Sequence, residues 1–474
     1  MLLKKSGILL AATLVVILAG CTKNNATTSK RRTTRRIIST TGRKTTEHDK
    51  TDPIIENKTI YVATNGLPSN IGTETSPTTI DHALTIMNTG DTIHLATGTY
   101  KRVASLSITN SGSEVKRNTI ECENGVILDF SSATDNGGFN LTGSYWQINN
   151  LNIANSNSYG FTIKGKGNKL NNCSSCDNSY GGYSIDSSVT TLTNCISENN
   201  SLDGYDAYGF YITGSGENNK FDSCVSTKNQ DSGFVILSNK AVTFDKCLAI
   251  DNGLTGDYAS SQRSGFVFNN KGHSFNNCIA YNNELCGFLV PTAYAEKGSF
   301  TIKNCSAINN HTRNFYLKTN NNDSILIENI LSYNGSNPTG PNDYIIGNVK
   351  NSIMVYQNGY YYEKSNTKYD SLDLTKTAIN MTSYTNKYKI NTEIPEEMKE
   401  YLDKAAKEAI DKATPSGVKP DYSSLEYKVI YYKDGKLNIY DYLDRALSFQ
   451  NELFTKLSIT KPVNFGAYVN EAIE

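Results

Sequence analysis

The sequence of 474 residues lacks an excess of charge of either sign, because 46 Lys and Arg residues balance 46 Asp and Glu residues. This balance disfavours a nucleic-acid binder of the generally basic type. Histidine is scarce, at five residues, and neither a Ser/His/Asp set nor a phosphate-cradling glycine loop is evident. The hydrophobic fraction is only 38%, but 30 Tyr and 16 Phe can supply a core, which excludes disorder of the whole chain.

An apolar run from Ile8 to Leu18 follows two lysines and ends at Cys21. This pattern predicts an export signal over residues 1–20. The small residues before Cys21 resemble a bacterial lipobox, which implies that Cys21 is diacylated and anchors the chain to the outer side of a membrane; plain secretion is the alternative. Residues 21–58 contain ten Lys or Arg and four Asp or Glu without apolar periodicity. They predict a flexible basic tether, with binding to an anionic lipid or wall polymer as the alternative.

A repeat with a fixed phase occupies the middle of the chain. Six cysteines are each followed by Asn five residues later and then by Gly or Asn next to an aromatic residue. With the Cys position allowed to be aliphatic, the series runs from Leu151 to Asn358 and comprises about nine coils with a basal period of 22 residues. The six cysteines are Cys173, Cys195, Cys224, Cys247, Cys278 and Cys305.

A period of this length with short strands predicts an all-β fold, a right-handed parallel β-helix in which coils stack about 4.8 Å apart. We expect the Cys column to point inward as mostly free thiols, and the Asn column to form a buried ladder that bonds to the backbone at each corner.

The ends of the predicted β-helix, residues 59–394, differ in composition from its middle. A strand at Ile60–Val62 and a helix face formed by Ile80, Leu84 and Met87 predict an N-terminal cap. Residues 395–474 predict a small helical C-terminal module, in which Glu396–Ala413 has an apolar helix face.

Two coils depart from the usual interval of nine residues between Cys and Gly, and insertions in a solenoid emerge as loops where sites tend to lie. The loops and the intervening corner place carboxylates on one side of three successive coils. Such oxygens can hold Ca²⁺, although Asp and Gly are also common turn formers. The candidate calcium ligands are Asp203, Asp206, Asp231 and Asp257, and the candidate sugar-stacking residues are Tyr205, Tyr208 and Tyr258.

Several segments of the chain look like family 9 polysaccharide lyases, the Pel9A-like pectate lyases, over roughly residues 59–360. They are Tyr61–Gly66, Gly90–Ile93, Gly214–Phe221 and Arg313–Phe315. The resemblance implies a β-helix that holds Ca²⁺ at an Asp-rich cluster. It also implies that a Lys after a Gly-Phe pair removes the proton next to the uronate carboxylate.

This chain departs from the family pattern at the base, because the corresponding residue after Gly265-Phe266 is Val267. Arg263, at the end of the longer loop, is the candidate catalytic residue instead. The family's acidic cluster falls on Asp231, with one of three carboxylates retained, or in a shifted register on Asp203 and Asp206.

Three functions therefore remain open. The first is a lyase that cleaves an acidic, uronate-containing polysaccharide by calcium-assisted β-elimination, and the second is a surface protein that binds such a glycan without cleaving it. The third is a structural or adhesive β-helix, while a two-carboxylate hydrolase is a further possibility. In each case we expect a monomer.

Overall fold

The computed structural model describes residues 57–201, 206–214, 216–254, 262–294, 298–318, 325–333, 343–345, 348–350 and 353–355, and two short strands near the C-terminus. Those strands, β34 (Tyr432–Lys433) and β35 (Lys436–Leu437), pair antiparallel. The predicted export signal, tether and Cys21 lie outside the described residues, as does the predicted C-terminal module apart from this strand pair. No helix in the described ranges is long and apolar enough to cross a membrane.

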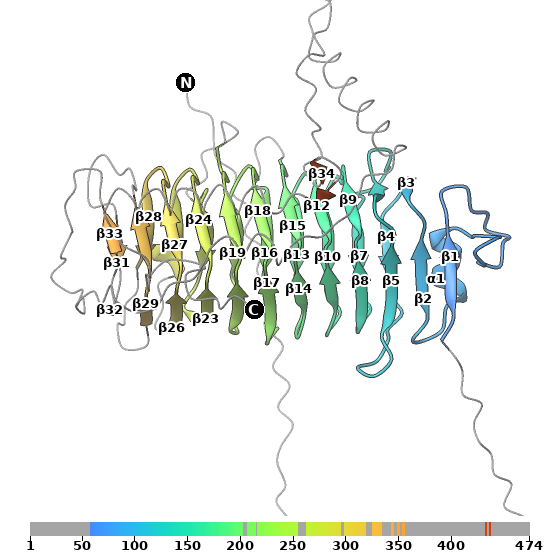
Figure 1. The fold of residues 1–474 in the computed structure, drawn as a ribbon, viewed down its shortest axis with the longest axis horizontal. Coiled ribbons are helices and arrows are strands. Elements are labelled where there is room, and N and C mark those ends of the chain that lie inside the picture. The colour runs from blue at the N-terminus through green and yellow to red at the C-terminus, as the bar shows by residue number, and fades with distance from the viewer. Residues whose placement is uncertain are drawn as a thin grey trace, which may run out of the picture. The chain divides into compact units, whose positions relative to one another are not determined.

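The β-helix consists of three parallel sheets, to which each full coil contributes one strand in turn (Figure 1). The first sheet contains β1 (Thr59–Val62), β2 (Thr92–Leu95), β5 (Asn118–Cys122), β8 (Trp146–Asn149), β11 (Lys169–Asn171), β14 (Thr191–Thr193), β17 (Asn219–Asp222), β20 (Val242–Asp245), β23 (Lys271–Asn276), β26 (Ser299–Lys303), β29 (Ile325–Glu328) and β32 (Asn348–Lys350).

The second sheet contains β3 (Gly98–Lys101), β6 (Val126–Asp129), β9 (Asn152–Ala154), β12 (Ser174–Cys176), β15 (Ile196–Glu198), β18 (Val225–Thr227), β21 (Leu248–Ile250), β24 (Ile279–Tyr281), β27 (Ser306–Ile308), β30 (Leu331–Tyr333) and β33 (Ile353–Val355). The third sheet contains β4 (Leu106–Ile108), β7 (Phe139–Leu141), β10 (Tyr159–Ile163), β13 (Gly181–Ile185), β16 (Tyr208–Ile212), β19 (Phe234–Ile236), β22 (Phe266–Phe268), β25 (Cys286–Val290), β28 (Arg313–Leu317) and β31 (Tyr344–Ile345). The right-handed parallel β-helix predicted from the repeat is confirmed, and its stack begins before the first coil that carries the Cys-Asn motif.

A residue with left-handed backbone forms the corner between the first and second sheets. Asn tolerates this conformation better than most residues, which explains its frequency at the corner. The next residue then points inward, and in six coils it is a buried cysteine. All nine cysteines of the described ranges are free and buried, as expected from the repeat. The corner residues, with φ between 50° and 59°, are Asn150, Asn172, Asn194, Ser223, Lys246, Asn277, Asn304 and Asn329.

The predicted Asn ladder is present inside the corner between the second and third sheets. In the first five members, the side-chain Nδ2 donates to Oδ1 of the Asn in the next coil over 2.7–3.0 Å, and that Oδ1 also accepts the backbone N–H of the donor residue. Asn310 Nδ2, at the end of the ladder, donates to Asn314 Oδ1 over 2.8 Å. The ladder thereby satisfies buried polar groups that would otherwise destabilise the bend. Its members are Asn178, Asn200, Asn229, Asn252, Asn283 and Asn310.

Aromatic side chains from the Gly-aromatic pairs stack along the interior of the third sheet. From Phe161 to Phe315, the ring centroids of neighbouring coils lie 4.6–5.1 Å apart. This column and the inward residues of the other two sheets form one continuous core. The period of the motif therefore matches the repeat of the core.

A helix, α1 (Ile80–Ile86), is present where the N-terminal periodicity predicts one. Thr79 caps it by accepting the backbone N–H of His82, and Ile80 and Ala83 are buried in the core. Leu84 and Met87 pack against the same core. The covering of the end of the column by this segment stays a prediction.

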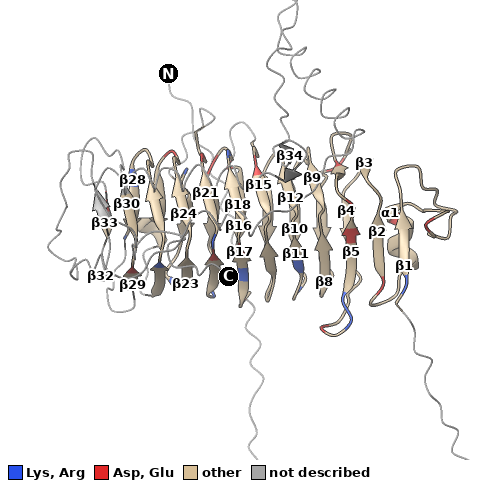
Figure 2. Ribbon diagram, viewed as in Figure 1, with Lys and Arg blue, Asp and Glu red and all other residues tan. Residues whose placement is uncertain are grey.

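The outward faces of the first and second sheets differ in polarity and burial. First-sheet strands alternate buried residues with half-buried or exposed polar ones, and Figure 2 shows charged residues on β5, β11, β17 and β29. In contrast, all three residues of β15, β18, β21, β24 and β27 in the second sheet are buried.

Candidate functional site

The resemblance assigns a catalytic base to the position of Val267, which lies on the outer face of the third sheet. Val267 is fully buried there and forms an apolar cluster on the outside of the coils with Val235 and Leu289. The Phe266 side chain points into the core, so the side chain of the next residue, Val267, points outward by strand alternation. The structure therefore places an apolar side chain where proton abstraction would need an ionisable group.

Three tyrosines form a stack next to this apolar cluster. The rings of Tyr159 and Tyr211 are nearly parallel, at 6° with centroids 6.3 Å apart, and Tyr208 lies 5.2 Å from Tyr211. Gly181 makes the arrangement possible, because a Cβ at this position would come within 2.8 Å of the Tyr159 ring and 2.3 Å of a backbone oxygen. Residues that carry a side chain also rarely adopt its φ of 143°. We call Tyr159, Tyr208 and Tyr211 the tyrosine stack.

Burial raises the pKa of each hydroxyl in the tyrosine stack. For Tyr208, a hydrogen bond to Asp206 raises the pKa further, and nearby Asp231 adds to the shift. The Tyr208 hydroxyl donates to Asp206 Oδ2 over 2.7 Å. All three hydroxyls therefore stay protonated at neutral pH. The Tyr208 hydroxyl donates its proton to Asp206, and those of Tyr159 and Tyr211 are neutral donors.

Of the predicted calcium ligands, the structure describes Asp206 and Asp231, both close to Tyr208. Asp231 is 1% exposed, and Ser232 Oγ donates to its Oδ1 over 2.8 Å. Among the described residues, no three acidic, His or Cys side chains converge to hold a metal ion. These two aspartates therefore do not fit a calcium ion by themselves. Asp203 and Asp257 lie outside the described residues, as do Tyr205 and Tyr258.

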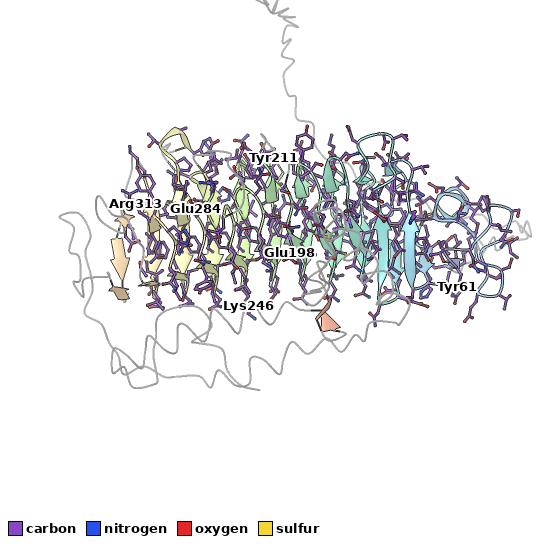
Figure 3. The ribbon with its side chains drawn as sticks, turned by 90° about the horizontal axis from the view of Figure 1, so that it is seen from above. Tyr61, Glu198, Tyr211, Lys246, Glu284 and Arg313 are labelled. Carbon is purple, nitrogen blue, oxygen red and sulfur yellow. The ribbon has the colours of Figure 1, made fainter. Side chains whose placement is uncertain are left out.

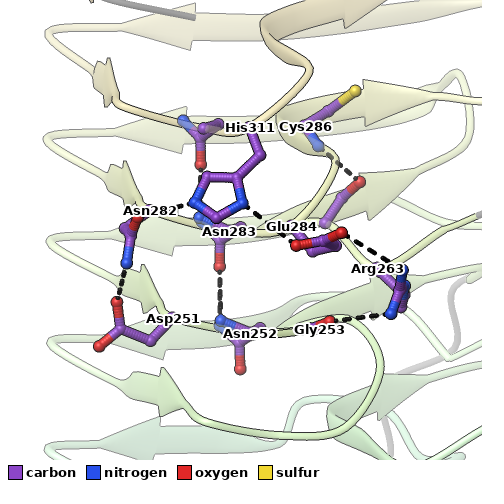
Figure 4. A network of polar contacts seen from close by, with 11 residues as sticks. Asp251, Asn252, Gly253, Arg263, Asn282, Asn283, Glu284, Cys286 and His311 are labelled. Carbon is purple, nitrogen blue, oxygen red and sulfur yellow. Dashed lines mark hydrogen bonds and ion pairs between the residues drawn. The ribbon is translucent and has the colours of Figure 1, made fainter. Parts of the chain in front are cut away.

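The candidate base Arg263 belongs to a chain of polar contacts along the corner between the second and third sheets (Figure 4). Its Nη2 lies 3.3 Å from Glu284 Oε1, and its Nη1 donates to the Gly253 carbonyl over 3.2 Å. Arg263 and Glu284 thus form an ion pair between neighbouring coils. The contacts thus join Arg263 to Gly253 and to the next coil, and the catalytic role of Arg263 stays a prediction.

The polar contacts continue from Glu284 across the neighbouring coils. Glu284 Oε2 lies 3.1 Å from His311 Nδ1, and His311 Nε2 lies 3.0 Å from Asn282 Oδ1. Asn282 Nδ2 then donates to Asp251 Oδ1 over 2.7 Å. Asp251 is therefore held by Asn282 of the next coil at this corner.

Sequence reasoning missed Tyr159, Tyr211 and Arg313. A signal for Tyr211 was present, because it follows Gly209-Phe210 just as Val267 follows Gly265-Phe266. The Arg313 guanidinium carbon lies 4.9 Å from the centroid of the Tyr316 ring, in contact with its face. Figure 3 shows Tyr211, Glu284 and Arg313 on one side of the stack of coils and Lys246 on the other.

Comparisons with known proteins agree with this architecture. The family model described as "Pel9A-like, right handed beta helix region" matches residues 60–337. Pectate lyase L of Thermoclostridium stercorarium is 34% identical over 105 residues, which are 21% of this chain and 8% of that protein. The chain therefore matches only a small part of this curated relative.

Two solved structures share the fold at low sequence identity. Pectate lyase Pel9A is 20% identical with a TM-score of 0.52, over 71% of this chain and 86% of that chain. A rhamnogalacturonan lyase is 19% identical with a TM-score of 0.51, over 66% of this chain and 87% of that chain. At these identities, both similarities show the fold alone.

Proposed function

Because the chain belongs to the Pel9A-like right-handed β-helix family, we propose that it is a surface protein that binds an acidic, uronate-containing polysaccharide on the outer face of its third sheet. The observation that carries the proposal is the tyrosine stack beside the buried Val267. Family membership and the pectate and rhamnogalacturonan lyases among the relatives support a polysaccharide ligand.

The chemistry of this face suits a sugar chain. Tyrosine rings offer apolar surface to sugar C–H groups, and their protonated hydroxyls offer hydrogen bonds to sugar oxygens. Arg313 adds a cation four coils from Tyr208, at about 4.8 Å per coil, where it could pair with a uronate carboxylate.

Ca²⁺ is the cofactor that the resemblance implies, with Asp203, Asp206, Asp231 and Asp257 as the candidate ligands. A bound Ca²⁺ would neutralise the uronate carboxylate against these aspartates. Since the two described aspartates do not form a calcium site alone, the proposed binding rests on the tyrosine stack, and calcium dependence is one arm of its test.

The proposed location is the outer side of a bacterial membrane, with a lipid on Cys21 and residues 22–58 as the tether. We also propose a monomer, since one β-helix carries the whole face. Mass spectrometry of the N-terminal peptide should detect a covalent lipid in the parent and none in Cys21→Ala, whereas a parent without lipid would contradict lipid anchoring.

The test is calorimetric titration of the protein with polygalacturonate and with a neutral glycan of equal length, with Ca²⁺ or with a chelator. We expect binding to the uronan, weakened at least tenfold by Tyr211→Ala and by Tyr159→Ala. Tyr61→Ala is the matched control, because Tyr61 lies on the first sheet beside His94 and should leave affinity unchanged. Equal affinity of all three variants would refute the assignment to this face.

The same samples decide between binding and cleavage. Ultraviolet absorbance of an unsaturated product would show β-elimination, the second candidate function, which family membership favours. Loss of that product in Arg263→Lys, with binding retained, would identify Arg263 as the base. Absence of both binding and product with every uronan would leave the structural or adhesive function.

A further inference from the structure

The tyrosine stack lies in the negative field of two aspartates. The Tyr208 hydroxyl donates to Asp206 Oδ2 over 2.7 Å, and the backbone N–H of Asp231 donates to the carbonyl of Ala207 over 3.1 Å. After burial, the charge of Asp206 contributes to the raised pKa of all three tyrosines, and the charge of Asp231 contributes to that of Tyr208. A field that opposes ionisation of a tyrosine also opposes the carboxylate of a ligand.

Basic side chains do not neutralise Asp206. No Lys or Arg in the described ranges lies within ion-pair distance of its carboxylate, which is held by Tyr208. Arg263 is paired with Glu284. Arg313 lies four coils beyond β16, about 19 Å along the stack at about 4.8 Å per coil, which exceeds the Debye length of about 8 Å at physiological ionic strength (Figure 3). A free carboxylate beside the stack would therefore meet Asp206 with no described cation between them.

Calcium is the other group that would join a ligand carboxylate to these aspartates. Among the residues that the structure describes, no three acidic, His or Cys side chains converge on a metal ion. Asp206 accepts the hydrogen bond of Tyr208, and Asp231, which is 1% exposed, accepts that of Ser232. This arrangement favours a ligand group that carries no charge and needs no bridging cation.

Apolar side chains lie next to the tyrosine stack. Leu237 and Leu285 are half-buried and pack against the same apolar cluster as Tyr208 and Tyr211. Their accessible parts offer surface to a small apolar substituent. Methyl esterification of a uronate carboxylate removes its charge and adds a methyl group. An esterified residue therefore avoids repulsion by Asp206 and gains apolar contact.

We infer that the tyrosine stack binds uronate residues whose carboxylates are esterified, in preference to the free polyanion and without Ca²⁺. The inference rests on the proposed function, because it specifies the ligand of the same face. The disagreement between the two described aspartates and a calcium site is its starting point. The neutral hydroxyls of Tyr159 and Tyr211 can then bond to the ester and ring oxygens of the sugar.

The experiment is calorimetric titration of the full chain with two polygalacturonates of equal length, one unesterified and one largely methyl-esterified. In the presence of a chelator, we expect the esterified chain to bind at least tenfold more tightly. Replacing the chelator by Ca²⁺ should leave the affinity for the esterified chain unchanged, because no carboxylate of that chain needs a bridging cation.

Asp206→Asn tests the source of this preference. The change removes the charge and keeps a side-chain oxygen that can accept the Tyr208 hydroxyl. Affinity for the unesterified chain should rise at least fivefold, and affinity for the esterified chain should stay the same. Asp222→Asn is the matched control, because it removes the same charge from β17 of the first sheet and should change neither affinity. Leu237→Asn should weaken binding of the esterified chain alone, at least threefold.

Three results would overturn the inference, and they also separate it from the proposed function. Tighter binding of the unesterified chain, with Ca²⁺ or with the chelator, would overturn the inference and leave the proposed function standing. Equal affinity for both chains, unchanged in Asp206→Asn, would do the same, because the charge of Asp206 would then have no effect on the ligand. Absence of binding to either chain would overturn the proposed function as well.

Discussion

The first and second sheets of this β-helix contain strands of the same coils, but their outer faces differ. Outward residues of the first sheet, such as Lys169, Lys220 and Thr243, are exposed. Their counterparts in the second sheet, such as Val225 and Ile279, are fully buried. The strands of the two sheets run in parallel at the same spacing, so backbone geometry does not explain the difference. What differs is the type of outward side chain, which is charged or polar in these first-sheet residues and aliphatic in their second-sheet counterparts.

This contrast changes what a substitution is expected to do. On the first sheet, an outward side chain contacts water and its neighbours in the column, so replacing it costs little. On the second sheet, it belongs to a second apolar layer outside the core. Four experiments sharpen the comparison, from the largest expected effect to the smallest.

A carboxylate introduced on each face should give the largest difference in the free energy of unfolding. Ile279→Asp should lower the free energy of unfolding by about 3–5 kcal/mol, because it buries an unpaired carboxylate. Thr243→Asp should change it by less than about 0.5 kcal/mol. Denaturant-induced unfolding followed by circular dichroism measures both. Losses of equal size would show that the two faces are equally solvated.

Removal of one amide from each polar ladder should give the next largest difference. Asn229→Ala removes the Oδ1 that accepts both Asn200 Nδ2 and the Asn200 backbone N–H inside the corner, and should cost about 2–3 kcal/mol. Asn149→Ala, in the outer ladder of the first sheet, breaks its contacts with Glu121 and Asn171 near water and should cost less than about 1 kcal/mol. The same unfolding assay applies, and an equal cost would contradict the assigned burial.

A buried carboxyl at the C-terminal end of the Asn ladder, Asp343, predicts that stability depends on pH. Asn314 donates to Ser332 Oγ, which donates to Asp343 Oδ2, and burial raises the pKa of Asp343 to about 6. The folded state thus holds this proton more tightly than the unfolded state does. The stability that Asp343 contributes is fully present below its unfolded pKa, near 4, and is lost as pH rises through about 6.

Unfolding of the parent and of Asp343→Asn at pH 4 and pH 7.5 measures this contribution. The parent should lose roughly 2 kcal/mol more than the variant between the two values. Asp135→Asn is the control of opposite sign, because backbone hydrogen bonds from Gly137 and Ser105 lower the pKa of this exposed carboxyl. An identical pH profile for parent and Asp343→Asn would contradict burial of this proton.

The cysteine column should give the smallest effect. Cys224→Ala removes one buried sulfur and should cost about 1 kcal/mol, whereas Lys220→Ala on the outer face should cost less than about 0.5 kcal/mol. Burial also raises the pKa of the Cys224 thiol. Alkylation of the folded chain should therefore be slow and should become rapid on unfolding. Rapid labelling of Cys224 in the folded chain would show that the core is open there.

Most of the β-helix could be predicted from its repeat, because each coil places the same residue types at the same corners. The residue after Asn172 or Asn194 must turn inward, and Cys173 and Cys195 do so. The aliphatic outer face of the second sheet also left a trace that sequence reasoning overlooked. An aliphatic residue follows four of the cysteines, as Ile196, Val225, Leu248 and Ile279, although this position points outward.

The candidate site was less predictable. The sequence placed Val267 at the base position and Asp206 and Asp231 near one another, and the structure places both aspartates beside Tyr208. The tyrosine stack could not be predicted, because Tyr159 and Tyr211 belong to coils two apart and meet across Gly181. Arg263 was chosen for its position in a loop, and its partner Glu284 comes from the next coil.

The sequence alone determined the coil, its period and its interior, because inward residues must repeat wherever identical corners stack. Only the tertiary structure decided the exterior. A column of outward side chains becomes a charged surface, an apolar cluster or a tyrosine stack according to the side chains that neighbouring coils place beside it. The physical reason is that burial is a property of the neighbourhood of a side chain, and the repeat specifies only the neighbours inside.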